Sequence, residues 1–155
     1  MSIVGFNFTK INAERKNAIV GTVNISNNIQ LKDVSEAKLG LGGDRGALRI
    51  SFAFRSEYVP ELASIAFEGD VLILVEQKVQ ASILEQWKTS KQLPRQIAEQ
   101  MINHILDRCN IQALLVSKDL NLPSPVPLPK VQVTMPDTPD EKSEEPMKST
   151  KVKKK

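Results

Sequence analysis

The stretch ASIAFEGDVLILV, residues 63–75, decides the fold that this sequence predicts. Apolar side chains stand at every second position and share one face of a strand: Ala63, Ile65, Phe67, Val71, Ile73 and Val75. Gly69 interrupts the series and predicts a bend or a bulge. Leu72 and Leu74 add apolar surface to the opposite face. A strand that is apolar on both faces needs two coverings, so we expect helices on one face and a partner subunit, the chain's own proline-rich segment or a ligand on the other.

The preceding residues also predict strands. Leu48, Ile50, Phe52 and Phe54 alternate with more polar residues, which indicates a strand with one buried face. Glycine-rich residues 39–46, LGLGGDRG, lack the order of a phosphate-binding loop and predict a hairpin loop.

Nearer the N-terminus, alternation predicts a half-buried strand over about Ile3–Ile11. A polar turn is expected at Asn12–Asn17, followed by a strand over Ala18–Ile25. The same parity resumes at Ile29 and Leu31, as one long bent strand or two short ones.

Helical periodicity replaces the strand pattern after residue 76. Val79, Ile83, Leu84 and Trp87 form one stripe of a short helix that ends near Thr89 and Ser90. Pro94 suits the first turn of a second helix. Its apolar stripe comprises Ile97, Ala98, Met101, Ile102, Ile105, Leu106 and Cys109, with an interruption expected at Asn110. Strands followed by helices indicate an α+β fold.

Composition divides the chain into three parts. Residues 1–120 form the predicted α+β domain, residues 121–133 a proline-rich extended arm, and residues 134–155 a charged tail. The tail contains no Ile, Leu, Phe, Tyr or Trp, so we expect it to be disordered. In the arm, proline at alternate positions favours extended geometry and places Leu122, Val126 and Leu128 at one parity. The arm is expected to cover its own domain or to dock on a neighbouring subunit.

Charge and reactive residues exclude several classes of protein. Residues 1–133 hold 15 basic and 13 acidic side chains, so no basic nucleic-acid-binding face is indicated. The sole histidine, His104, and the sole cysteine, Cys109, have no partners at zinc-ligand or catalytic spacing. We therefore expect no catalytic site, metal or cofactor, and structural roles for both residues. Without a signal peptide or a run of apolar residues long enough to span a bilayer, a cytoplasmic protein is expected.

The order of these features resembles the SecB family of protein-export chaperones. The resemblance is carried by Phe6-Asn7-Phe8, by Ala63–Leu74 with its central glycine, by Pro94–Arg108 and by Leu120-Asn121-Leu122-Pro123. It implies a four-stranded antiparallel sheet followed by two helices, a tetramer, and binding of non-native polypeptides without a cofactor. The family is acidic, whereas this chain has a pI of about 9.0, and delivery to an export motor does not follow from the resemblance.

Two functions are therefore expected from different classes. The first is a non-enzymatic, self-associating polypeptide-binding or assembly protein that uses Leu72, Leu74, Leu122, Val126 and Leu128. The alternative is a ribosome- or RNA-associated accessory protein whose polyanion-binding residues are Lys151, Lys153, Lys154 and Lys155.

Overall fold

A four-stranded antiparallel sheet followed by two helices forms the domain. The computed structural model describes residues 1–40 and 42–130. Its elements are β1 (Ser2–Arg15), β2 (Asn24–Ala37), β3 (Arg45–Val59), β4 (Ala63–Glu76), α1 (Gln77–Ser90) and α2 (Arg95–Asp119). The strand order is β1-β4-β3-β2, and every neighbouring pair is antiparallel. The predicted fold class is confirmed.

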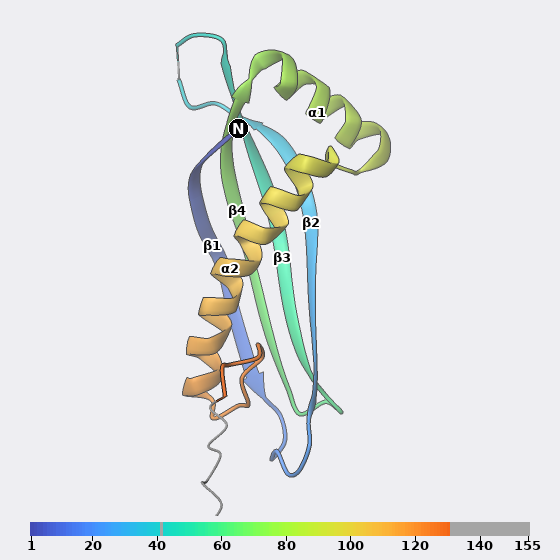
Figure 1. The fold of residues 1–155 in the computed structure, drawn as a ribbon, viewed down its shortest axis with the longest axis vertical. Helices are drawn as coiled ribbons and strands as arrows, with labels where there is room; N and C mark the ends of the chain where they lie inside the picture. The colour runs from blue at the N-terminus through green and yellow to red at the C-terminus, as the bar shows by residue number, and fades with distance from the viewer. Residues whose placement is uncertain (41, 131–155) are drawn as a thin grey trace, which may run out of the picture.

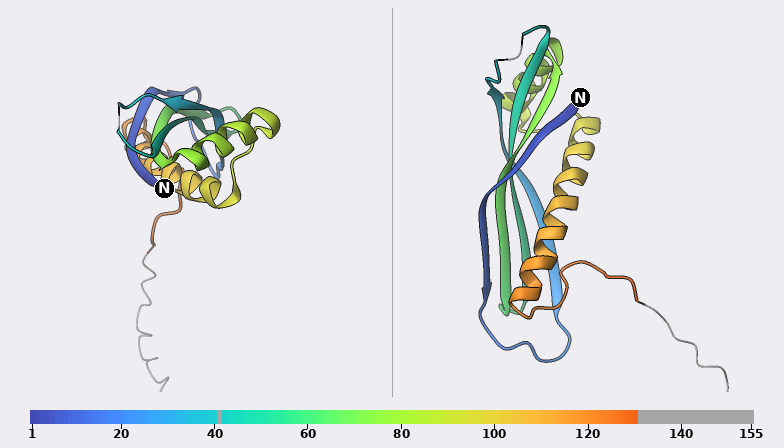
Figure 2. Two further views of the ribbon diagram at one scale, coloured as in Figure 1. Left: turned by 90° about the horizontal axis from the view of Figure 1, so that it is seen from above. Right: turned by 90° about the vertical axis from the view of Figure 1, so that its left-hand side faces the viewer.

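Both helices lie on one side of the sheet, which we call the inner face. Figure 1 shows α2 crossing this face diagonally, with α1 at the upper end beside the β2–β3 loop. No helix covers the opposite side, the outer face, in the described residues (Figure 2, right). The sheet therefore separates a covered surface from an open one.

The alternating residues of β3 and β4 form the core on the inner face. The fully buried members include Leu48, Ile50, Phe52, Phe54, Ile65, Phe67, Val71 and Ile73. Helix α2 adds a row at four-residue spacing, Met101, Ile105, Cys109, Ala113 and Ser117, all buried. The strand positions match the predicted parity. Three of the seven residues predicted for the helical stripe, Met101, Ile105 and Cys109, belong to the buried row, and the other four are half-buried: Ile97, Ala98, Ile102 and Leu106.

The predicted boundaries of the first two strands are wrong. β1 continues through the expected polar turn to Arg15, which pairs with Ala63. Residues 18–23 connect β1 to β2 and are not a strand, and Val20 is 88% exposed. The physical reason is that β1 is an edge strand whose outer face is exposed to water. Its polar residues can therefore continue the strand without being buried.

The irregularity expected at Gly69 lies on the neighbouring strand. β4 is continuous, and the register of β1 shifts between Phe8 and Lys10, directly opposite Gly69. A Cβ at Gly69 would lie 2.2 Å from the Asn7 carbonyl oxygen and 2.7 Å from Phe52 Cζ. The glycine therefore permits a close approach of backbone and aromatic ring, and the bulge belongs to β1.

The helices depart from prediction in two places. α2 runs without a break through Asn110 to Asp119, because the buried row continues at Ala113 and Ser117. In α1, Val79 is exposed, and the buried stripe is Gln80, Ile83 and Trp87. Gln80 occupies the space left by the missing side chain of Gly46 and donates from Nε2 to the Ala47 carbonyl at 3.0 Å.

Candidate polypeptide-binding surfaces

The outer face can be read row by row across the sheet from the strand register. From the upper end downward, the rows are Ala37, Ala47, Leu74 and Ser2; Ser35, Arg49, Leu72 and Gly5; Asp33, Ser51, Asp70 and Asn7; Gln30, Ala53, Glu68 and Lys10; Asn28, Arg55, Ala66 and Asn12; Ser26, Glu57, Ser64 and Glu14. Within these six rows, large apolar side chains occur only in the upper two; Val59, which shares the parity of Glu57 and pairs with Asn24 at the lower end of the sheet, is 46% exposed. We call Leu72, Leu74 and Ala37 the outer patch.

The outer patch is half-buried by its neighbours in the sheet and is not covered by a helix. Gly5 lies opposite Leu72, and a Cβ on this glycine would lie 3.3 Å from Leu72 Cδ1. The missing side chain on β1 thus leaves room for Leu72 to lie against the strand. The two-sided apolarity of β4 is real, but on the outer face it is confined to one end.

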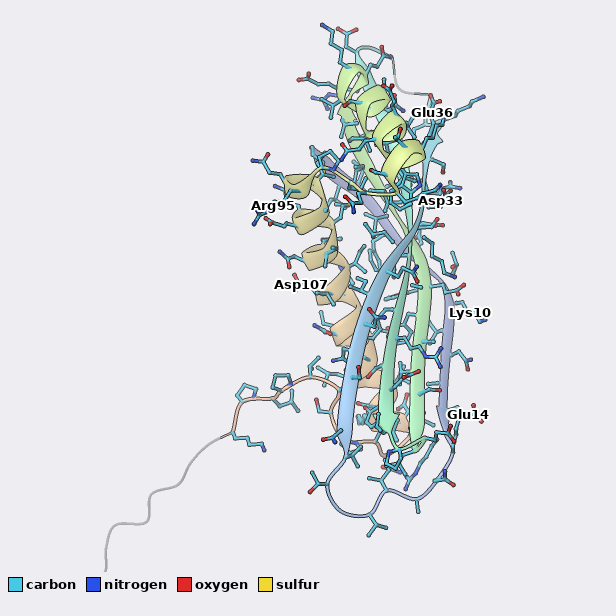
Figure 3. All side chains as sticks on the ribbon, turned by 90° about the vertical axis from the view of Figure 1, so that its right-hand side faces the viewer. Lys10, Glu14, Asp33, Glu36, Arg95 and Asp107 are labelled. Atoms are coloured by element: carbon cyan, nitrogen blue, oxygen red, sulfur yellow. The ribbon has the colours of Figure 1, made fainter. Side chains whose placement is uncertain are left out.

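Below the patch, the outer face is polar. Ser51 donates to Asp70 at 2.7 Å, and Lys32 Nζ lies 2.9 Å from Glu68 Oε1. The hydrogen bond and charge of Lys32 lower the pKa of Glu68. Figure 3 shows charged side chains such as Lys10, Glu14 and Asp33 projecting from the sheet, with Arg95 and Asp107 on the helix beyond it. Such a surface favours water over an apolar partner.

The remaining predicted binding residues lie elsewhere, on the arm at the lower end of the inner face. Leu122 is buried at 8% exposure, Val126 is half-buried and Leu128 is 52% exposed. Two side chains hold the arm: Tyr58 Oη donates to the Pro123 carbonyl at 2.6 Å, and Asn27 Nδ2 donates to the Pro125 carbonyl at 2.8 Å. The structure therefore does not bring Leu122, Val126 and Leu128 together with Leu72 and Leu74.

A recess that the sequence did not indicate lies between the start of β1 and α2. It has a volume of about 340 Å³ and is lined by Ile3, Val4, Gly5, Phe6, His104 and Arg108. The rings of Phe6 and His104 meet edge to face at 5.7 Å. His104 Nε2 is buried and has no hydrogen-bond partner among the described residues. The contact joins residues far apart in the chain, so no local pattern could have revealed it.

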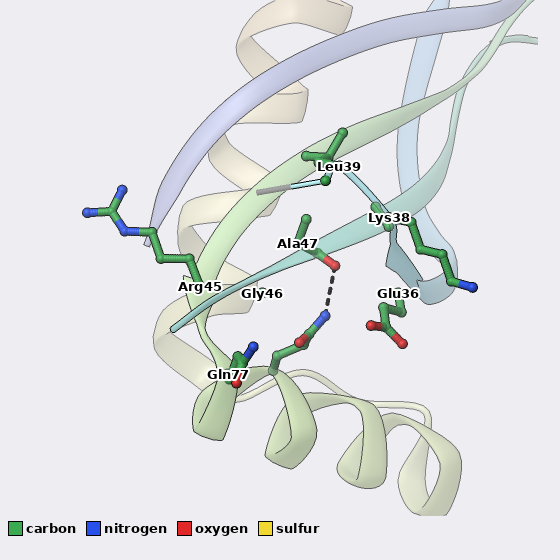
Figure 4. Close-up of a pocket in the computed structure, with 10 residues that line it drawn as sticks. Glu36, Lys38, Leu39, Arg45, Gly46, Ala47 and Gln77 are labelled. Carbon is green, nitrogen blue, oxygen red and sulfur yellow. Dashed lines mark hydrogen bonds between the residues drawn. The ribbon is translucent and has the colours of Figure 1, made fainter. Parts of the chain in front are cut away.

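A second recess lies at the upper end, beside the start of α1 (Figure 4). Its volume is about 240 Å³, and its lining includes Glu36, Lys38, Arg45 and Gln77. Charges of both signs line this small opening, so it favours no particular ligand charge.

The sole cysteine, Cys109, is buried in the core. Burial raises the pKa of the Cys109 thiol to about 12, so the thiol is protonated at neutral pH. Within the part of the chain that the structure describes, no cluster of His, Cys, Asp or Glu could hold a metal ion. Among the same residues, no helix is long and apolar enough to cross a membrane. Lys151, Lys153, Lys154 and Lys155, and residues 131–133 of the predicted arm, lie outside the described residues.

Comparison with known proteins gives a structural match but no sequence match. Neither a protein-family model nor a curated protein sequence matches this chain. Among solved structures, the chain is similar to the SecB-like chaperone Rv1957 of Mycobacterium tuberculosis, solved in complex with a ChAD peptide from the Rv1956 HigA1 antitoxin. The TM-score is 0.51 with 13% identity, over 86% of this chain and 92% of the other. The domain therefore has a SecB-like fold.

Proposed function

We propose that this protein is a non-enzymatic, chaperone-like polypeptide-binding or assembly protein. The observation that carries the proposal is the outer patch, in which Leu72 and Leu74 lie on a sheet face without a helical covering. The SecB-like fold supports it, because the similar solved protein is described as a chaperone bound to a peptide. The ligand would be an apolar segment of a non-native chain or of a partner subunit.

The size of the outer patch indicates how it would work. Complete burial of a leucine side chain contributes about 1.5–3 kcal/mol, and both leucines are already half-buried. A stable protein interface buries roughly 800 Å² on each partner, far more than two such side chains provide. The patch would therefore bind short extended segments weakly, and a homo-oligomer would gain affinity by presenting several patches at once.

The test compares two serine variants on the same face. Leu72→Ser with Leu74→Ser is expected to weaken capture of a reduced, permanently unfolded protein by about tenfold or more, from the lost apolar burial. Ala53→Ser with Ala66→Ser, in the polar rows, is the matched control and should bind as the unchanged chain does. Binding is measured by fluorescence anisotropy of the labelled client, and assembly by size exclusion with light scattering. A monomer that ignores the client, or equal affinities for both variants, would contradict the proposal.

A further inference from the structure

The end of α2 directs the arm back onto the sheet. Asn121 adopts a left-handed conformation with φ 51°, its amide donates to the Lys118 carbonyl at 3.2 Å, and the Leu122 amide donates to the Ser117 carbonyl at 2.8 Å. This pair of bonds is a Schellman motif, in which the residue after the turn packs its apolar side chain against the helix. Buried Leu122 fills that role. The chain therefore reverses at a fixed point and passes over the lower inner face (Figure 1).

The lower inner face carries several side chains that can donate a hydrogen bond, and one of them, Arg15 on β1, donates from Nη1 to the Leu120 carbonyl at 3.3 Å, just before the arm begins. Tyr58 and Ser56 lie on β3, and Asn27 lies on β2 directly opposite Ser56. Tyr58 and Asn27 donate to the arm. Ser56 Oγ is fully buried and has no partner among the described residues. These donors lie on the part of the sheet that is covered by the arm as well as by α2.

The chemistry of the arm matches these donors. Residues 123, 125, 127 and 129 are all proline, so these positions offer carbonyl oxygens but no amide hydrogens. The two carbonyls that accept hydrogen bonds from the sheet belong to Pro123 and Pro125, two residues apart, and the chain bends at Pro125 and Val126, where Ser124 Oγ donates to the Val126 carbonyl. Recognition therefore uses backbone carbonyls and apolar rings, and does not require one particular sequence.

We propose that the lower inner face, with donors Asn27 and Tyr58, is a polypeptide-binding site that the arm occupies in cis, and that its external ligand is an extended, proline-containing apolar segment of a client. The assignment of that ligand to a client rests on the proposed function. Arm and ligand compete, because both need the same two donors. Buried Leu122 stays anchored as the hinge. Val126, which is half-buried, and Leu128, which is exposed, leave the sheet with the rest of the arm.

Competition with a tethered segment sets the expected affinities. A short tether gives the arm an effective concentration on the order of millimolar, so a free peptide of equal intrinsic affinity binds the unchanged chain weakly. Weakening the arm without touching the donors should reveal the site. Pro125, which is buried, is the position for that change, and exposed Pro127 is its matched control.

The experiment uses the full chain and a labelled peptide of residues 121–130, NLPSPVPLPK, followed by fluorescence anisotropy. Pro125→Gly should bind the peptide about tenfold more tightly than the unchanged chain, since glycine makes the free arm more flexible and removes a buried ring. The affinity of Pro127→Gly for the peptide should stay within about twofold of that of the unchanged chain. Adding Tyr58→Phe to Pro125→Gly should lose about threefold or more, because one carbonyl then lacks its donor.

Equal peptide affinities for Pro125→Gly and Pro127→Gly would overturn the proposal. So would a dimer with exchanged arms, detected by light scattering, since the occupant would then be a second copy. A measurement on the unaltered chain guards against misfolding of the variants: saturating peptide should speed hydrogen exchange at the Val126 amide, which donates to Ser124 Oγ at 3.3 Å. An unchanged exchange rate at full occupancy would also overturn it.

Capture of the unfolded protein, measured on the same variants, separates the two proposals. Capture without any response of the peptide to Pro125→Gly supports the outer patch and overturns the arm site. Peptide binding that responds as expected, without capture, supports the arm site and contradicts the proposed function.

Discussion

The inner and outer faces of the sheet are made by the same strands, yet they distribute apolar side chains differently. On the inner face, buried apolar residues follow one another along the whole of β3 and β4. On the outer face, Leu72 and Leu74 lie in the two upper rows, the rows below hold mainly charged and polar side chains, and Val59 is exposed at the lower end. The inner face therefore buries most of the apolar surface of the sheet, and we expect substitutions on the outer face to cost less stability.

The sharpest way to break this comparison uses two consecutive residues of β4. Ile73 is fully buried on the inner face and Leu72 is half-buried on the outer face. Ile73→Ala should lower the free energy of unfolding by about 2–5 kcal/mol through lost burial and a cavity, and Leu72→Ala by about 1 kcal/mol or less. Urea denaturation followed by the emission of Trp87, the sole tryptophan, measures both. Similar losses would mean that the outer face is covered.

A second prediction tests the contrast with two glycines. Gly69→Ala on the inner face should cost about 1–3 kcal/mol, because the new methyl group meets the backbone of Asn7 and the ring of Phe52. Gly5→Ala on the outer face meets only the side chain of Leu72, at 3.3 Å or more, and should cost less. Thermal unfolding of the two variants compares them, and a larger loss for Gly5→Ala would contradict the assignment of the faces.

A third prediction concerns Tyr58, where the inner face meets the arm. Burial raises the pKa of its phenol from 10.0 to about 12, so the fold favours the neutral form. The stability that depends on the neutral phenol is complete below pH 10 and is lost as the pH rises through about 12. Tyr58 is the only tyrosine, so the phenolate absorbance reports it alone. Tyr58→Phe should lower the free energy of unfolding by about 1 kcal/mol near neutral pH. The variant should also lack the part of the alkaline destabilisation that Tyr58 causes. A Tyr58 phenol that titrates at its ordinary pKa in the unchanged chain would refute this prediction.

The smallest effect is expected on the polar rows of the outer face. Glu68→Gln removes the ion pair with Lys32, in which the two side chains are 47% (Lys32) and 42% (Glu68) exposed. Because the pKa of Glu68 is lowered, the stability that the ion pair contributes is present above the ordinary pKa range of a carboxyl group. It is lost as the pH falls through the lowered pKa. We expect a slight fall in melting temperature that disappears in high salt. A loss that persists in high salt would point to a structural role.

Sequence patterns predicted the inner face well because its cause is local. The alternation in β3 and β4 and the four-residue spacing in α2 identify the buried residues without knowledge of their partners. The ends of β1 were missed because pairing with β4, and not the polarity of residues 12–15, determines them. The extent of the outer patch depends on cross-strand register, which places Arg49 beside Leu72.

The arm shows the same limit. Its prolines predicted an extended segment, but its donors lie 65 and 98 residues away in the sequence, at Tyr58 and Asn27. One local signal was available: an asparagine before Leu-Pro at the end of a helix is typical of a left-handed helix terminus. That signal would have predicted the reversal after α2, although not the surface that it reaches.

The strand order also has a consequence for how the chain acquires its structure. β2, β3 and β4 are consecutive hairpin neighbours, whereas β1, which precedes all three in the sequence, pairs with β4, so that Ser2 must find Leu74. Closing so long a loop is entropically costly, which favours formation of the three-stranded meander before β1 joins it. Until β1 arrives, the edge of β4 is a template for any extended strand nearby. A chain in which β1 has not yet paired would therefore expose to other chains an edge that the folded protein covers.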